Sequence, residues 1–160
     1  MTTVPIDSWP TATLDGVRRL RVLAAAVPGV HLEERDLVVS CDQLWAFITD
    51  LERSVPSFDQ QVTKLQITER SGGHLRVVAH TRSWLQVPFE ADLEPGFLWM
   101  QAAARAYVVG LAAVALDATH TRYAHLEGIP NRLGARMLRR TARHVRADVD
   151  AVARLTQSPE

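Results

Sequence analysis

Hydrophobic residues recur at two spacings along the 160-residue chain, and each spacing predicts its own kind of element. Between residues 12 and 27 they return every three or four positions, which predicts a helix that ends at the Pro28-Gly29 pair. Residues 31–40 then favour a first strand. The chain therefore begins with a helix followed by a strand.

The next segment carries a helix start signal. Ser40 and Gln43 match a capping box, in which the serine hydroxyl accepts from the Gln43 amide and the glutamine side chain reaches back to the serine amide. We expect a short helix from here to about Asp50, with Pro56 ending the region.

From Gln60 onward the apolar period changes to two, which is typical of strands. Short segments rich in glycine, proline and aspartate separate the runs. The predicted strands are residues 61–70, 74–83, 86–94, 97–104, 106–117 and 120–128. Consecutive strands with short links indicate an antiparallel meander.

The longest periodic segment runs from Asn131 to about Gln157 and predicts a helix with one apolar and one basic face. The apolar face consists of Leu138, Ala142, Val145, Val149 and Val152. The opposite face carries an arginine stripe made of Arg132, Arg136, Arg139, Arg140, Arg143 and Arg146. The stripe is either a solvated face or a weak contact for an anionic surface such as lipid head groups.

One apolar stretch, PGFLWMQAAARAYVVGLAAVAL at residues 95–116, is long enough for a transmembrane helix, which needs about 20 residues. Gln101 and Arg105 lie in its middle, where hydrocarbon would disfavour them, and both flanks have the composition of hairpin turns. We therefore expect two neighbouring strands, covered on both faces, and no transmembrane segment.

Composition narrows the classes of partner and compartment. Eighteen Lys and Arg balance eighteen Asp and Glu, so the chain has no overall attraction to nucleic acid. No aromatic residues interleave with the arginine stripe to stack on bases. The single cysteine, Cys41, excludes an internal disulfide and a multi-cysteine zinc site, and it favours a cytoplasmic location.

Local sequence adds to this order of elements. In LVVSCDQLWAFITDLERSVPSFDQQV, residues 37–62, the helix around Trp45 ends at Asp50 and a proline follows at position 56. With a strand, short helices, a six-stranded meander and a long last helix, the chain resembles the START/Bet v 1-like (SRPBCC) superfamily. The resemblance is to its polyketide cyclase/dehydrase and lipid-transport-like branch, over roughly residues 31–155.

The resemblance implies an α+β helix-grip fold. A curved antiparallel sheet of about seven strands would wrap around the long C-terminal helix and enclose an apolar cavity. The domain would span residues 31–157, with residues 1–30 as an N-terminal helical extension. The extension could cover the outer sheet face, cap the cavity mouth or mediate a homodimer.

A ligand cavity needs a mostly apolar lining with a few oriented polar groups. Alternation in THTRYAHLEG, residues 119–128, places Tyr123, His125 and Glu127 on one face. The register usual for the last strand of the family turns that face inward, although the alternation alone leaves the opposite face possible. The predicted ligand-binding residues are Trp99, Gln101, Tyr107, Tyr123, His125 and Glu127.

Other candidate chemistry is weaker. The remaining histidines show no paired ligand spacing, so we expect surface groups and no metal site; they are His31, His74, His80, His120 and His144. Cys41 at a helix N-terminus could have a lowered pKa, but no neighbouring partner in the sequence indicates a nucleophile, and we expect a packing residue. No nucleotide-binding motif occurs, and we expect no cofactor.

Three functions remain. The first is a cytoplasmic protein that binds a hydrophobic small molecule, such as a lipid or polyketide, between sheet and C-terminal helix. The second is a polyketide aromatase/cyclase or dehydratase in which His125 and Glu127 act as acid and base on an enol-forming substrate. The third is a ligand-free interaction module with a filled core. Cavity volume separates the third from the others, because a drug-sized ligand needs about 300–1,000 Å³.

Overall fold

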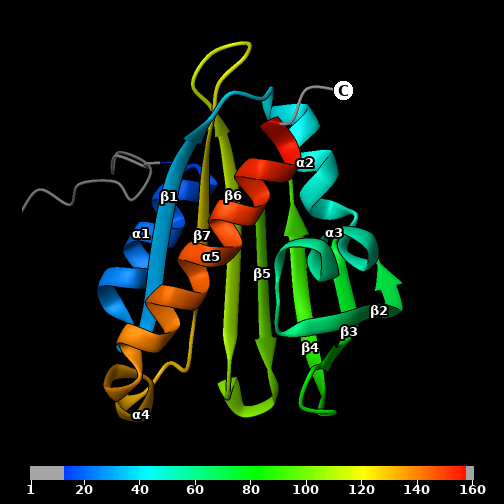
Figure 1. Cartoon of the computed structure of the whole chain (residues 1–160), viewed down its shortest axis with the longest axis vertical. Coiled ribbons are helices and arrows are strands. Elements are labelled where there is room, and N and C mark those ends of the chain that lie inside the picture. The colour runs from blue at the N-terminus through cyan, green and yellow to red at the C-terminus, as the bar shows by residue number, and fades with distance from the viewer. Residues whose placement is uncertain (1–12, 158–160) are drawn as a thin grey trace, which may run out of the picture.

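Within residues 13–157, which the computed structural model describes, seven strands form one antiparallel sheet in the order β1-β7-β6-β5-β4-β3-β2 (Figure 1). Strands β2 to β7 form a meander, and β1 pairs with β7. The strands are β1 Val30–Leu37, β2 Val62–Ser71, β3 His74–Thr81, β4 Gln86–Glu94, β5 Phe97–Ala102, β6 Val108–Ala115 and β7 Thr121–Gly128. The expected seven-stranded α+β architecture is confirmed.

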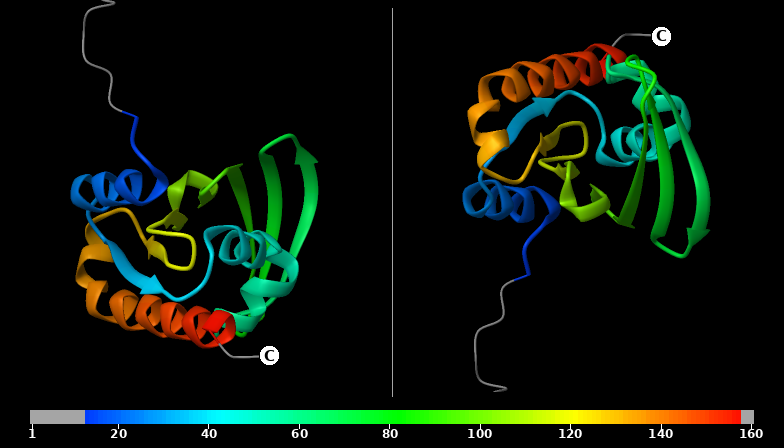
Figure 2. Two further views of the ribbon diagram at one scale, coloured as in Figure 1. Left: turned by 90° about the horizontal axis from the view of Figure 1, so that it is seen from above. Right: turned by 90° about the horizontal axis from the view of Figure 1, so that it is seen from below.

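Helices lie on both sides of this sheet. Figure 2 shows the sheet curling around the side that carries the C-terminal helix, with the N-terminal helix on the outer side. The helical elements are α1 Gly16–Ala26, α2 Cys41–Thr49, α3 Leu51–Phe58, the 3-10 turn η2 Ala103–Arg105, α4 Arg132–Arg136 and α5 Leu138–Gln157. This is the helix-grip arrangement that the family resemblance implies.

The sheet separates two hydrophobic cores. The inner core, on the concave face, includes Leu37, Leu98, Leu111, Tyr123, Val145, Val149 and Val152. The outer core, under α1, consists of Val17, Leu20, Val30, Phe97, Val108, Ala112, Ala124 and Leu126. Because neighbouring residues of a strand point to opposite faces, β5, β6 and β7 each contribute to both cores.

The two-strand prediction for residues 95–116 is confirmed, and both faces of the strand pair are covered. Strand β5 ends at Ala102, two residues earlier than predicted, because η2 follows, in which Ala104 and Arg105 have positive φ angles of 55° and 54°. Among residues 13–157, no helix is long and apolar enough to cross a membrane.

The N-terminal helix α1 covers the outer sheet face. Its Asp15 cap accepts a hydrogen bond from the Arg18 amide at 2.9 Å, which satisfies one free amide of the first turn. Gly110 of β6 permits the close packing, since a Cβ atom there would lie 2.5 Å from Leu20 Cδ2. Of the three roles considered for this segment, covering the outer face is the one that its packing shows.

Two helix predictions need correction. The region after Asp50 forms an additional helix, α3, with Pro56 inside it, because Leu51, Val55 and Phe58 recur at helical spacing and are buried. The predicted helix from Asn131 is divided into α4 and α5. In α5, Val145, Val149 and Val152 are buried as expected, whereas Leu138 is 37% exposed.

Packing of α1 on the sheet can be tested with Leu20→Ala. Leu20 is fully buried against β6, so we expect the free energy of unfolding to fall by about 2–5 kcal/mol in urea denaturation. Val22→Ala on the same helix is the control, because Val22 is 56% exposed. Equal effects of the two changes would contradict the described packing.

Candidate functional site

A cavity of about 550 Å³ lies on the concave side of the sheet, between β2–β7, α3 and α5. Its size is within the range of sites for small molecules. Apolar side chains form much of its wall, among them Val55, Phe58, Leu65, Met100, Val109 and Leu111. The polar groups of the wall include Asp59, Tyr107, His125, Glu127 and His144.

Strand β7 directs alternate side chains to the two cores. Tyr123, His125 and Glu127 point to the concave side, whereas Ala124 and Leu126 belong to the outer core. His125 and Glu127 reach the cavity wall, but Tyr123 is fully buried in the inner core behind them. Tyr107, which follows the η2 turn, also lines the cavity.

Trp99 and Gln101 do not lie in this cavity. They share a face, as the sequence predicts, but the face is the outer one, because Met100 between them is the residue that points inward. Both line a separate hollow of about 820 Å³ beside α1. A strand that is apolar on both faces carries no alternation from which its direction could be predicted.

Glu127 is the centre of the buried polar group. Its Oε1 lies 2.7 Å from His125 Nε2, and its Oε2 accepts a 2.7 Å hydrogen bond from the Tyr107 hydroxyl. The Tyr123 hydroxyl lies 3.4 Å from the other ring nitrogen of His125. The Glu127 side chain is only 4% exposed, so these partners take the place of water around its carboxylate.

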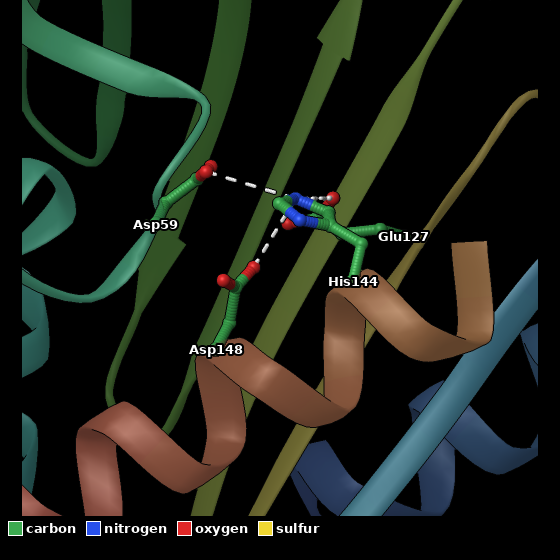
Figure 3. Close-up of side chains that lie close together, drawn as sticks. All are labelled: Asp59, Glu127, His144 and Asp148. Atoms are coloured by element: carbon green, nitrogen blue, oxygen red, sulfur yellow. Dashed lines mark ion pairs between the residues drawn. The ribbon is translucent and has the colours of Figure 1, made fainter. Parts of the chain in front are cut away.

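A second set of polar residues meets Glu127 from the helical side (Figure 3). His144 Nε2 of α5 lies 3.5 Å from Glu127 Oε2, 3.3 Å from Asp148 Oδ2 and 3.6 Å from Asp59 Oδ1. Asp59 follows the end of α3, and its Oδ1 accepts from the Gln61 amide at 2.7 Å. Four residues from three parts of the chain therefore converge at one end of the cavity.

The expectation that His144 is a surface group is wrong, and Asp59 and Asp148 were not predicted at all. His144 is 20% exposed and lies against buried carboxylates. One signal in the sequence could have indicated Asp148. Its spacing from Val145 and Val152 is that of one helical face, and this is the face that must be buried. A carboxylate in that position requires a partner.

Burial drives the pKa values of the carboxylates apart. Loss of solvent, followed by repulsion from Glu127 and Asp59, raises the pKa of Asp148 to about 9. Burial and Glu127 also raise the pKa of Asp59. For Glu127, burial acts upward, but His125, His144 and Tyr107 together leave its pKa below the usual value. At neutral pH Glu127 carries the negative charge and Asp148 retains a proton.

All six residues of the arginine stripe are exposed on α4 and α5, but two of them also have contacts within the protein. Arg140 lines the cavity near Met137 and Thr141. Arg146 lies 3.3 Å from Glu33 of β1, which is a contact within the chain. The stripe is therefore not a uniform solvated face.

Comparison with known proteins gives a structural result only, since no protein-family model and no curated protein matches the chain. An aromatase/cyclase, ZhuI from Streptomyces sp. R1128, superposes with a TM-score of 0.65 at 16% identity, over 80% of this chain and 93% of that one. A START superfamily protein from Mycobacterium smegmatis gives a TM-score of 0.58 at 11% identity, over 79% and 97%.

The chain has the START/Bet v 1-like fold. A third solved structure, the di-domain aromatase/cyclase BexL from the BE-7585A biosynthetic pathway, superposes with a TM-score of 0.61 at 14% identity, over 87% of this chain and 54% of that one. At such low identities the similarity establishes the fold, and the chemistry has to be argued from this chain's own cavity.

Cys41 lies outside this site and packs against the inner core at the start of α2. Burial, with a contribution from Asp42, raises the pKa of its thiol, so the helix N-terminus does not lower it, and the expected packing role agrees with this. Cys41 therefore lacks the thiolate character of a nucleophile.

Because Cys41 is the only cysteine, alkylation reports on this one thiol. We expect iodoacetamide at pH 8 to modify the folded chain several-fold more slowly than the chain unfolded in urea, because the raised pKa and partial burial both protect it. The measurement is the mass shift against time. Equal rates in the two states would show that the thiol is not protected.

Proposed function

We propose that the chain binds a hydrophobic small molecule that carries oxygen, in the cavity between the sheet and α5. The observation that supports this most is the polar group around Glu127 at one end of an otherwise apolar cavity of about 550 Å³. A void of this size does not suit the third hypothesis, an interaction module with a filled core.

The binding energy would come from the apolar wall. Moving one methylene group from water into such a wall contributes about 0.8 kcal/mol. Phe58, Met100 and Leu111 are examples of side chains that would contact the ligand. Since the wall offers few polar groups, the body of the ligand is expected to be hydrocarbon or aromatic.

The polar end would orient the ligand. An anionic group is disfavoured there because Glu127 already carries negative charge. A carbonyl or hydroxyl suits it better, because Arg140 and Glu127, which both line the cavity, offer a hydrogen-bond donor and an acceptor. A neutral ketone, ester or phenol is the class that this arrangement favours.

A second candidate is catalysis on a polyketide-like substrate by an aromatase/cyclase or dehydratase. It is favoured by the 2.7 Å contact between His125 and Glu127 on the cavity wall, and by the aromatase/cyclases among similar structures. His125 would remove a proton next to a carbonyl to give an enolate, while Glu127 stabilises the imidazolium. The imidazolium of His125 would then give this proton to the β-hydroxyl of the substrate. The C–O bond would break, and the hydroxyl would leave as water.

Binding can be measured with the neutral apolar dye N-phenyl-1-naphthylamine, which fluoresces on leaving water. We expect one dye per chain, and about tenfold weaker binding for Val87→Trp, whose indole would occupy part of the inner cavity. Val22→Trp is the matched control, because it fills the outer hollow instead. A loss of affinity in the control alone would place the site beside α1 and refute the proposal.

Catalysis needs a separate measurement, with a poly-β-ketone thioester as substrate mimic and mass spectrometry of the product. If the chain is a dehydratase or cyclase, we expect loss of water, slowed about 100-fold or more by His125→Ala and by Glu127→Gln. His80→Ala should have no effect, because His80 lies on β3 between Ala79 and Thr81, which line the cavity, and therefore points to the opposite face. If the dye binds but the substrate mimic is not converted, the binding function is supported and the catalytic function is refuted.

A further inference from the structure

The polar end of the cavity has more carboxylates than its donors can satisfy. Asp59, Glu127 and Asp148 all approach the same atom, His144 Nε2. A ring nitrogen carries at most one proton, which can be donated to only one of them. The single imidazole can therefore not satisfy the hydrogen-bonding capacity of all three groups.

Asp148 has a polar neighbour, His144 Nε2 at 3.3 Å, but no hydrogen bond within the described chain. Its residue is fully buried, and within the described chain neither of its side-chain oxygens has a hydrogen-bond partner. Figure 3 shows the carboxylate pointing toward His144 and away from the helix that carries it. An unpaired buried carboxylate is costly, so its direction toward three other possible ligands indicates that something binds between them.

The distances suit a metal ion better than hydrogen bonds. His144 Nε2 lies 3.3, 3.5 and 3.6 Å from the three oxygens, beyond the usual length of about 2.7–3.2 Å for an N–H···O bond. With metal–ligand distances of about 2.0–2.2 Å, the edges of a tetrahedral zinc site measure about 3.3–3.6 Å. One ligand atom from each residue lies within 4.8 Å of all the others.

We propose that Asp59, Glu127, His144 and Asp148 bind one divalent metal ion, with Zn²⁺ as the best match. One imidazole nitrogen and three carboxylate oxygens form a donor set that Zn²⁺ accepts, together with Mn²⁺ and Fe²⁺. Mg²⁺ and Ca²⁺ fit less well, since they prefer oxygen ligands and higher coordination numbers. This inference does not depend on the proposed function.

The surroundings of these four residues support the site. Ligating carboxylates are usually held by further hydrogen bonds. Here His125 and Tyr107 hold the two oxygens of Glu127, and the Gln61 amide holds Asp59 Oδ1. Asp59 and His144 are partly exposed and line the cavity, so an ion has a route of entry.

A metal ion in this place would add a further property to the cavity. It would offset two of the three negative charges and, with four protein ligands completing a tetrahedral shell, would tie β7, α5 and the segment after α3 together at this end of the cavity.

The test uses the full chain, stripped of metal with EDTA and dialysed, and titrated with ZnCl₂ by calorimetry. We expect one Zn²⁺ per chain with a Kd below about 10 µM. Co²⁺ in place of Zn²⁺ should give the strong visible absorption of a tetrahedral site. Both signals should weaken at least about 100-fold in His144→Gln and in Asp148→Asn, which keep the volume of the site.

His74→Gln is the matched control. The His74 ring also contacts two carboxylates, Glu90 at 2.7 Å and Asp92 at 3.0 Å, but on the exposed face of β3 and β4. Zinc binding that His74→Gln removes and His144→Gln retains would overturn the proposal, as would the absence of binding in the wild-type chain. Circular dichroism of each variant ensures that a lost signal does not reflect unfolding.

The dye measurement keeps this proposal separate from the proposed function. If the dye binds to the inner cavity but zinc does not bind, the metal site is refuted and the ligand-binding function stands. If zinc binds through His144 but no apolar probe enters, the metal site stands and the binding function is refuted.

Discussion

Burial of both faces of the central strands is the constraint on which the rest of the structure depends. Strands β5, β6 and β7 carry apolar side chains in both directions, so each face must be covered by another layer. On the outer face α1 provides that cover, packed closely at Gly110. On the inner face α5 and α3 stand off from part of the sheet, and the space between them is the cavity.

This arrangement also explains why charged groups are found so deep in the protein. The strand that must contribute Ala124 and Leu126 to the outer core necessarily turns His125 and Glu127 inward. The buried Glu127 lies 3.5 Å from His144 of α5, and Asp59 and Asp148 approach the same imidazole. The polar cluster therefore joins residues of the sheet and of the helices, and it lies at the end of the cavity where β7 approaches α5.

Most of the fold could be predicted from the sequence because its strongest signals are local. The alternation of the strands, the Ser40 cap and the apolar face of the last helix each follow from neighbouring residues. The additional helix α3 was missed because Pro56 usually ends a helix, whereas here the burial of Leu51, Val55 and Phe58 is the stronger effect.

The site was harder to predict, because it depends on which face of each element is turned inward. Trp99 and Gln101 were assigned to the wrong face, since β5 is apolar on both sides and gives no direction. The resemblance to the family supplied the inward face of Tyr123, His125 and Glu127, which alternation alone had left open. His144 and Asp59 are 85 residues apart, as 144 − 59 gives, and no local pattern connects them.

The spacing within α5 has a consequence for how the chain tolerates change. His144 and Asp148 are one helical turn apart, and the same turns bury Val145, Val149 and Val152. Inserting a single amino acid between 144 and 148 would rotate one side chain by about 100° relative to the other. It would also swing the valines out of the core, so length variation in homologous proteins is expected in the hairpin loops and not in this helix.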